Sequence, residues 1–292
     1  MGRLIKAFFF KLSRDLAFRI TLIIGAGLAF MMTGLYLLID IGLGTFGEEG
    51  VKMLSGPNML LSSLSPVDNF GLAIPINLIT FICLEFTQGT IRNKIIAGHS
   101  KFKIYLALFL SGLILTFALL TVYLGLCTGL GTIFGGFDLN QPIINMTSLS
   151  SLMMASRADA WYVVQMLITA MVVYICIVSF TIFFAALFRN IGPCIPIVII
   201  ALMILSVGGS LVSLIAEGLE NDGLVTFVKI VDPLYVISGG GIESNVVIEN
   251  DQAIGYMKVE NGAFIATIIN NLVYAAAFFF GGAFIFMKRD VK

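Results

Sequence analysis

The chain has 292 residues, of which 59% are hydrophobic and only 12% are charged, and its formal net charge is zero. A soluble globular domain carries about a quarter charged residues. The deficit, together with long apolar runs, indicates a membrane protein. The balanced charge gives no indication of a nucleic-acid partner.

The first sixteen residues, MGRLIKAFFFKLSRDL, place apolar side chains at helical spacing and four basic side chains on the remaining face or its edges. This pattern predicts an amphipathic helix over 1–16 that lies in the membrane interface. Its apolar side chains, among them Phe8, are expected to face lipid.

Six apolar runs of about twenty residues follow, and they predict an all-α polytopic membrane protein with one transmembrane domain over 1–292. The connection 217–261 carries eight acidic residues against two lysines. It is long enough to fold partly onto the outer face of the membrane. The predicted spans are 17–39, 65–84, 102–130, 161–188, 193–216 and 262–287.

The charges of the connections predict the orientation. The N-terminus, the segment 85–103, the turn at Arg189 and the C-terminus together hold 13 Lys/Arg and 3 Asp/Glu, whereas the other connections hold 4 and 14. Because basic residues near span ends stay inside, the first set and both termini are expected in the cytoplasm. We expect the chain in the cytoplasmic membrane of a bacterium.

The sequence offers no catalytic, cofactor-binding or metal-binding residues. It has no Walker-type nucleotide motif and no nucleophile elbow. Its four cysteines show no CxxC spacing, and its single histidine, His99, has no second histidine or carboxylate cluster nearby. Asp40 and Glu85 stand at span ends, where water is expected to reach them, so an ion-coupled transporter is disfavoured.

Polar and small residues within the spans have two readings that the pattern leaves open. Pro75 and Asn77 in the second span, where the proline could kink the helix, could line a substrate path or pack against other helices. The same holds for the serines of the fifth span, Ser206, Ser210 and Ser213. For the GxxxG-like pair Gly125 and Gly129, helix packing is favoured.

The segment between the second and third spans predicts a helix over about 85–99 with one apolar stripe. Such a short helix is marginal alone in water and needs a surface, either lipid or a cytoplasmic partner. The stripe consists of Phe86, Thr90, Ile91 and Ile95, and the polar residues Arg92, Asn93 and Lys94 point elsewhere.

Within this segment, EFTQGTIRNK resembles the E-[F/Y]-x-x-G-T-[I/L]-R-N-K element of type-2 ABC transporter permeases, the ABC-2 family. VDPLY at 231–235 is similar to an element late in the outer loop of such permeases, and the span layout agrees over nearly the whole chain. The resemblance implies the non-catalytic permease subunit of an ATP-driven exporter. Two permease copies, identical or related, would work with two cytoplasmic ABC ATPases that bind ATP and Mg²⁺.

In that family the segment after the second span is a coupling helix that docks in a groove of the ATPase. Carried over, Ile91 and Ile95 would be the apolar anchors, and the path between the permeases would be lined by the second and fifth spans. The implied ATPase contacts are Glu85, Phe86, Gly89, Thr90, Ile91, Arg92, Asn93, Lys94 and Ile95, with a smaller contact at Arg189.

The expected cargo is a peptide, an antibiotic or another amphipathic molecule, because the residues expected along the path are mostly apolar. Two other functions stay open. The chain could be a scaffold or sensor that binds lipid or a regulator and transports nothing, or it could be an ion-driven secondary transporter.

Overall fold

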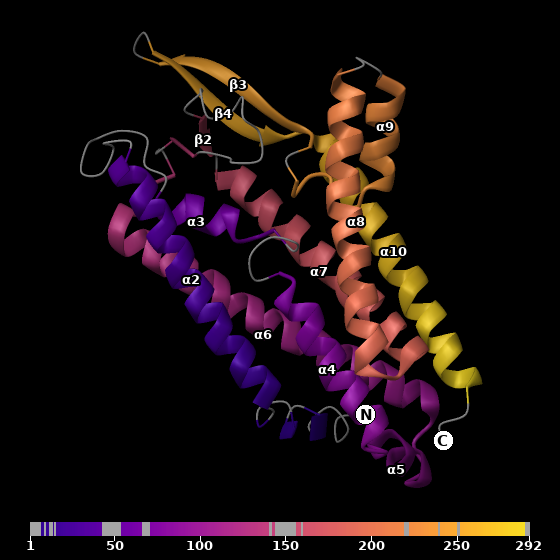
Figure 1. Cartoon of the computed structure of the whole chain (residues 1–292). Helices are drawn as coiled ribbons and strands as arrows, with labels where there is room; N and C mark the ends of the chain where they lie inside the picture. The colour runs from indigo at the N-terminus through magenta and orange to yellow at the C-terminus, as the bar shows by residue number, and fades with distance from the viewer. Residues whose placement is uncertain are drawn as a thin grey trace.

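The chain folds into a bundle of long helices with a small sheet at one end (Figure 1). The computed structural model describes residues 7–8, 10–11, 14, 16–42, 54–65, 71–139, 142–143, 156–158, 160–218, 222–238, 240–249 and 252–289. The predicted N-terminal helix therefore lies partly outside the described residues, and those of its residues that are described are helical.

The helices follow the apolar runs closely. Their bounds are α2 Leu16–Gly42, α3 Gly56–Ser62, α4 Ala73–Thr87, α5 Thr90–Ile96, α6 Lys101–Gly135, α7 Ala160–Phe188, α8 Ile191–Gly218, α9 Asp222–Val231 and α10 Asn261–Lys288. Among the described residues, five helices are long and apolar enough to cross a membrane: α2, α6, α7, α8 and α10. This composition is that of a multi-pass helical membrane protein.

The second predicted span, 65–84, is shorter than expected. Helix α4 begins only at Ala73 and has 15 residues, which is about 22 Å at the usual helical rise. It is long enough to cross a membrane only together with α5, and the angle of the bend between the two helices is 56°. Pro75 lies in the first turn of α4, where its missing N–H removes no helical hydrogen bond, so the expected kink is absent there.

The connection 217–261 contains more regular structure than the sequence indicated. Strands β3 (Ile242–Glu249) and β4 (Gln252–Val259) form an antiparallel hairpin, in the register Ile242↔Val259 to Glu249↔Gln252. Strand β2 (Ser156–Ala158) runs parallel to β4, and β1 (Pro142–Ile143) completes a sheet in the order β1-β2-β4-β3. This sheet lies at the end of the bundle opposite α5 (Figure 1).

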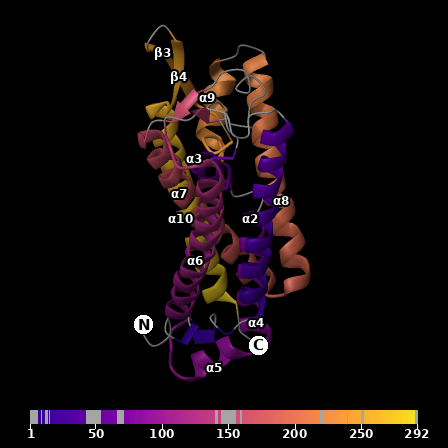
Figure 2. The ribbon, with the colours of Figure 1, turned by 90° about the vertical axis from the view of Figure 1, so that its left-hand side faces the viewer.

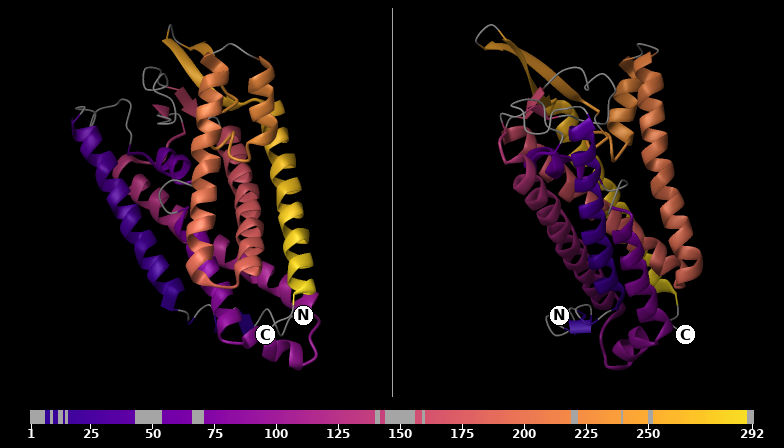
Figure 3. Two further views of the ribbon diagram at one scale, coloured as in Figure 1. Left: turned by 45° about the vertical axis from the view of Figure 1, so that its right-hand side comes forward. Right: turned by 60° about the vertical axis from the view of Figure 1, so that its left-hand side comes forward.

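Helices α6, α7 and α10 run beside one another (Figure 2), and aromatic rings from all three pack together. The ring of Phe279 in α10 lies 5.4 Å from that of Tyr105 and 4.8 Å from that of Phe109, both in α6. Phe278 packs edge-on against Phe180 of α7 at 5.0 Å. Helix α8 lies at the edge of the bundle (Figure 3), and 17% of its apolar stretch is buried, compared with 61% of that of α7.

Two glycines of α6 allow close packing, and they are not the predicted pair. A Cβ on Gly125 or Gly129 would meet no atom within 4 Å, so the packing expected there does not occur within the described chain. Two and six residues beyond Gly129, a Cβ on Gly131 would lie 2.7 Å from Met59 Cγ, and one on Gly135 would overlap the carbonyl oxygen of Leu54. The short helix α3 therefore packs on α6 at the second small-residue pair.

Candidate functional site

The motif residues build a sharp bend between α4 and α5. Gly89 adopts φ +67°, a left-handed conformation that favours glycine, and its carbonyl oxygen accepts the N–H of Asn93 in the first turn of α5. At the end of α4, the N–H of Gln88 donates to Leu84 O at 2.9 Å. The chain thus passes from one helix to the next through only two residues, Gln88 and Gly89.

A buried carboxylate fixes this bend. Glu85, in the last turn of α4 beyond the apolar part of the helix, is 1% exposed. Its Oε1 accepts from Lys11 Nζ at 2.6 Å, and its Oε2 accepts from Lys94 Nζ at 2.7 Å and from Thr90 Oγ1 at 2.6 Å. Thr90 also donates to the main-chain oxygen of Glu85 at 2.9 Å. The carboxylate therefore joins three segments: α4, α5 and the N-terminal residues.

The charged state of this carboxylate follows from its partners. Burial alone would raise the pKa of Glu85, but the hydrogen bonds from Lys11, Lys94 and Thr90 hold it below its ordinary value. The expectation that water reaches Glu85 is wrong, because protein groups replace it. The same correction applies to Asp40, which is 1% exposed and accepts the N–H of Leu54 at 2.8 Å.

The N-terminal residues dock on the bend as well. Phe8 is 1% exposed and packs edge-on against Phe81 of α4, with 6.1 Å between ring centroids. The ammonium of Lys94 lies 3.4 Å from the centroid of the Phe8 ring, a cation–π contact. Phe8 is therefore covered by protein, and its predicted contact with lipid is wrong.

The predicted ATPase contacts divide into buried and exposed residues. Ile91 is completely buried and Ile95 packs partly buried against the core, so the apolar stripe of α5 is covered by the chain itself. Ile91 therefore cannot act as an exposed anchor in this structure. Glu85, Gly89, Thr90 and Lys94 build the bend rather than its outer surface.

The outward face of α5 consists of different residues. Arg92, Asn93, Ile96 and Ala97 are all exposed, and their spacing puts them on one side of the helix. Ile96 is 73% exposed, so a large apolar side chain lies on the same face as the polar Arg92 and Asn93. The sequence already shows Arg92, Asn93 and Ile96 at helical spacing. The prediction was based instead on Ile91 and Ile95, which lie on the other face of α5.

The remaining predicted contacts, Phe86 and Arg189, meet each other. Arg189 follows α7 in a left-handed conformation with φ +56°, and its guanidinium lies 5.5 Å from the centroid of the Phe86 ring. Phe86 also packs edge-on against Phe286 of α10 at 5.9 Å. The turn between α7 and α8 is thereby brought beside the bend.

Asn77, one of the predicted path residues, packs between two helices. Asn77 is 2% exposed, and its Nδ2 donates to Thr21 Oγ1 at 2.6 Å and to Ala17 O at 3.0 Å, so this amide packs α4 against α2. Ser206 is half-buried on α8, and the side chains of Ser210 and Ser213 lie outside the described residues. Of the two readings, the structure favours helix packing for Asn77.

At the opposite end, the VDPLY element is held by α10. Asn271 Nδ2 donates to Pro233 O at 2.8 Å, and Asp232 Oδ1 accepts the N–H of Leu234 at 2.8 Å. Asp232 is 8% exposed, and burial raises its pKa to about 6 although the Leu234 N–H opposes the shift. Its Oδ2 lies so close to Gly209 of α8 that a Cβ there would overlap it.

Comparison of the chain with protein-family models, with curated proteins and with solved structures finds no match. The geometry of the bend is therefore the basis for assigning a function.

Proposed function

We propose that this chain is the membrane-spanning permease subunit of an ATP-driven exporter and that a cytoplasmic ATPase docks on the outward face of α5. The observation that carries the proposal is the combination of a fixed bend and an exposed apolar side chain on the helix that follows it. Glu85 ties α5 to α4, while Ile96 stands 73% exposed on the other side of α5. An exposed apolar side chain ringed by polar groups is typical of the centre of a small protein interface.

The fixed bend supports a mechanical role for α5. A glycine in a left-handed conformation would by itself be a flexible joint. The hydrogen bonds of Thr90 and Lys94 to Glu85 close this joint, so α5 and the end of α4 move together. Force applied by an ATPase to α5 would then reposition the membrane helices as rigid bodies rather than bend the connection.

The proposal includes a second permease copy, identical or related, with the substrate path between the copies and with a peptide, antibiotic or other amphipathic cargo. ATP and Mg²⁺ would bind only to the ATPase subunits. Both termini and α5 would face the cytoplasm, in agreement with the excess of basic residues in those segments.

The test is the variant Ile96→Asp. It puts a charge at the centre of the proposed contact and should abolish co-purification of the ATPase and the ATP turnover that depends on it. The matched control is Ile133→Asp on α6, because Ile133 is 75% exposed and lies near the other end of the bundle. Equal ATPase recovery with both variants would contradict the proposed contact. Export that persists without ATP but stops when the ion gradient is removed would contradict the ATP-driven function.

A further inference from the structure

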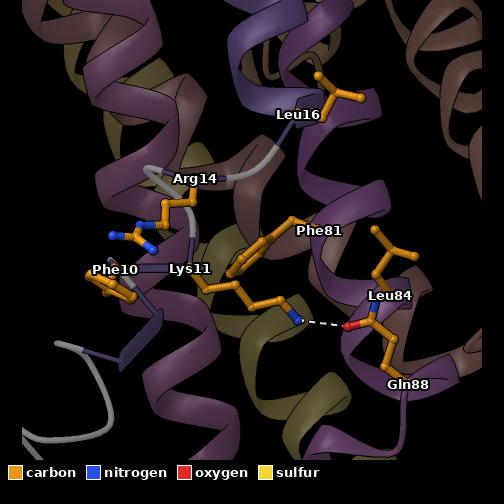
Figure 4. Close-up of a pocket in the computed structure, with 7 residues that line it drawn as sticks. All are labelled: Phe10, Lys11, Arg14, Leu16, Phe81, Leu84 and Gln88. Carbon is orange, nitrogen blue, oxygen red and sulfur yellow. Dashed lines mark hydrogen bonds between the residues drawn. The ribbon is translucent and has the colours of Figure 1, made fainter.

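A pocket of about 370 Å³ opens between the N-terminal residues and α4 (Figure 4). Lys11 and Arg14 contribute positive charges to its lining, and Leu16, Phe81 and Leu84 contribute apolar surface. None of its lining residues belongs to α5. The pocket is therefore separate from the face on which we place the ATPase.

The two basic side chains of the pocket, Lys11 and Arg14, retain N–H groups that can donate hydrogen bonds to an anion. The guanidinium of Arg14 lies 4.4 Å from the centroid of the exposed Phe10 ring, and it forms no ion pair with the residues that the structure describes. Lys11 Nζ donates to Glu85 Oε1 and, as Figure 4 shows, to Gln88 Oε1 at 2.9 Å. An ammonium has three donors. Because its side chain is 39% exposed, Lys11 can offer the third to a further acceptor.

The apolar part of the pocket lies at the ends of α2 and α4, where a bilayer is expected to change from hydrocarbon to headgroups. Leu16 is the first residue of α2 and is 69% exposed, and Leu84 stands in the last turns of α4. The pocket is thus level with the ends of two membrane helices. Basic side chains at this depth extend toward the interface while their neighbours contact the acyl chains.

We propose that this pocket binds one anionic phospholipid of the leaflet beside the N-terminal residues. The lipid phosphate contacts Arg14 and Lys11, and the first methylenes of an acyl chain lie against Leu16 and Leu84. Charge complementarity selects an anionic headgroup. A soluble phosphate would satisfy the cations but leave both leucines exposed, whereas a lipid covers them. Lys11 contacts the lipid and Glu85 at once, so the bound lipid also supports the bend.

The proposal is tested on the purified full chain in detergent by counting bound lipids with native mass spectrometry during titration with dioleoylphosphatidylglycerol. One lipid should bind more tightly than the rest, and dioleoylphosphatidylcholine should not replace it. The variant Arg14→Gln should weaken this first binding step about fivefold, the effect of one basic residue at an anionic interface. The matched control is Arg19→Gln, because Arg19 is exposed on α2 but does not line the pocket.

Three results would overturn the proposal. Equal weakening by Arg14→Gln and Arg19→Gln would show general attraction between basic residues and lipid. Equal binding of the phosphatidylcholine would show that the headgroup charge is not recognised. Displacement of the lipid by millimolar glycerophosphoglycerol, the same headgroup without acyl chains, would show a site for soluble phosphate esters.

Discussion

The substitution Glu85→Gln tests whether one carboxylate fixes the bend between α4 and α5. Glutamine keeps nearly the same volume and an oxygen that can accept the Thr90 hydroxyl, but it removes the negative charge. Lys11 and Lys94 would then hold two ammonium groups near a neutral amide. Both lysines are only partly exposed, at 39% and 20% of their side chains, so water replaces the lost partner incompletely.

The loss in free energy of unfolding expected for Glu85→Gln lies between two known limits. Removing one partner of a fully buried ion pair costs about 3–5 kcal/mol. Breaking an exposed pair costs less than about 1 kcal/mol. Glu85 is buried and its partners are partly exposed, so Glu85→Gln should lower the free energy of unfolding by about 2–3 kcal/mol.

The matched control is Glu260→Gln. Glu260 is 43% exposed and pairs with Lys229 at 2.6 Å, so its loss should cost less than about 1 kcal/mol. Unfolding in detergent gives the global effect of each variant. Amide hydrogen exchange should show faster exchange in α5 and in the N-terminal residues for Glu85→Gln, and no change in α7. An equal loss in free energy of unfolding for the two variants, or unchanged amide exchange in α5, would refute the conclusion that Glu85 fixes the bend.

Two further predictions concern packing and pH. Gly135→Ala should lower the free energy of unfolding by about 1–3 kcal/mol, because the new methyl group meets the backbone at Leu54, whereas Gly129→Ala has open space and should be neutral or stabilising. Equal unfolding temperatures would contradict this. Burial raises the pKa of Asp232 from 3.8 to about 6, so the folded state holds this proton more tightly and its stability should fall as the pH rises from about 4 to about 6. The total loss is up to about 3 kcal/mol. Asp232→Asn should remove this part of the pH dependence, and an unchanged slope in unfolding measured from pH 4 to 8 would count against it.

The long helices could be predicted because their apolar runs are continuous. The span predicted over 161–188 is α7, Ala160–Phe188, almost to the residue. The sheet could not be predicted from local pattern. Strand β2 has three residues, and it pairs Arg157 with Tyr256, about a hundred residues further along the chain. The second span was predicted from residue 65, whereas α4 begins at Ala73, and residues 66–70 lie outside the described part of the chain.

The sequence assigned the ATPase contact to a face of α5 that the chain itself covers. The spacing of Ile91 and Ile95 identified one face of α5, and we expected lipid or a partner to cover it. The chain itself covers Ile91, which leaves Ile96 outward. Helical periodicity shows which residues share a face, but it does not show which surface that face meets. The contact of Lys11 with Glu85 spans 74 positions and leaves no local signal.

These contacts indicate how motion would spread from α5 if an ATPase moves it. Thr90 and Lys94 join α5 to Glu85 of α4, and Asn77 joins α4 to Thr21 of α2. A displacement of α5 therefore reaches α2 and α4 together. In the proposed exporter, this coupled motion would open and close the substrate path between the two permease copies.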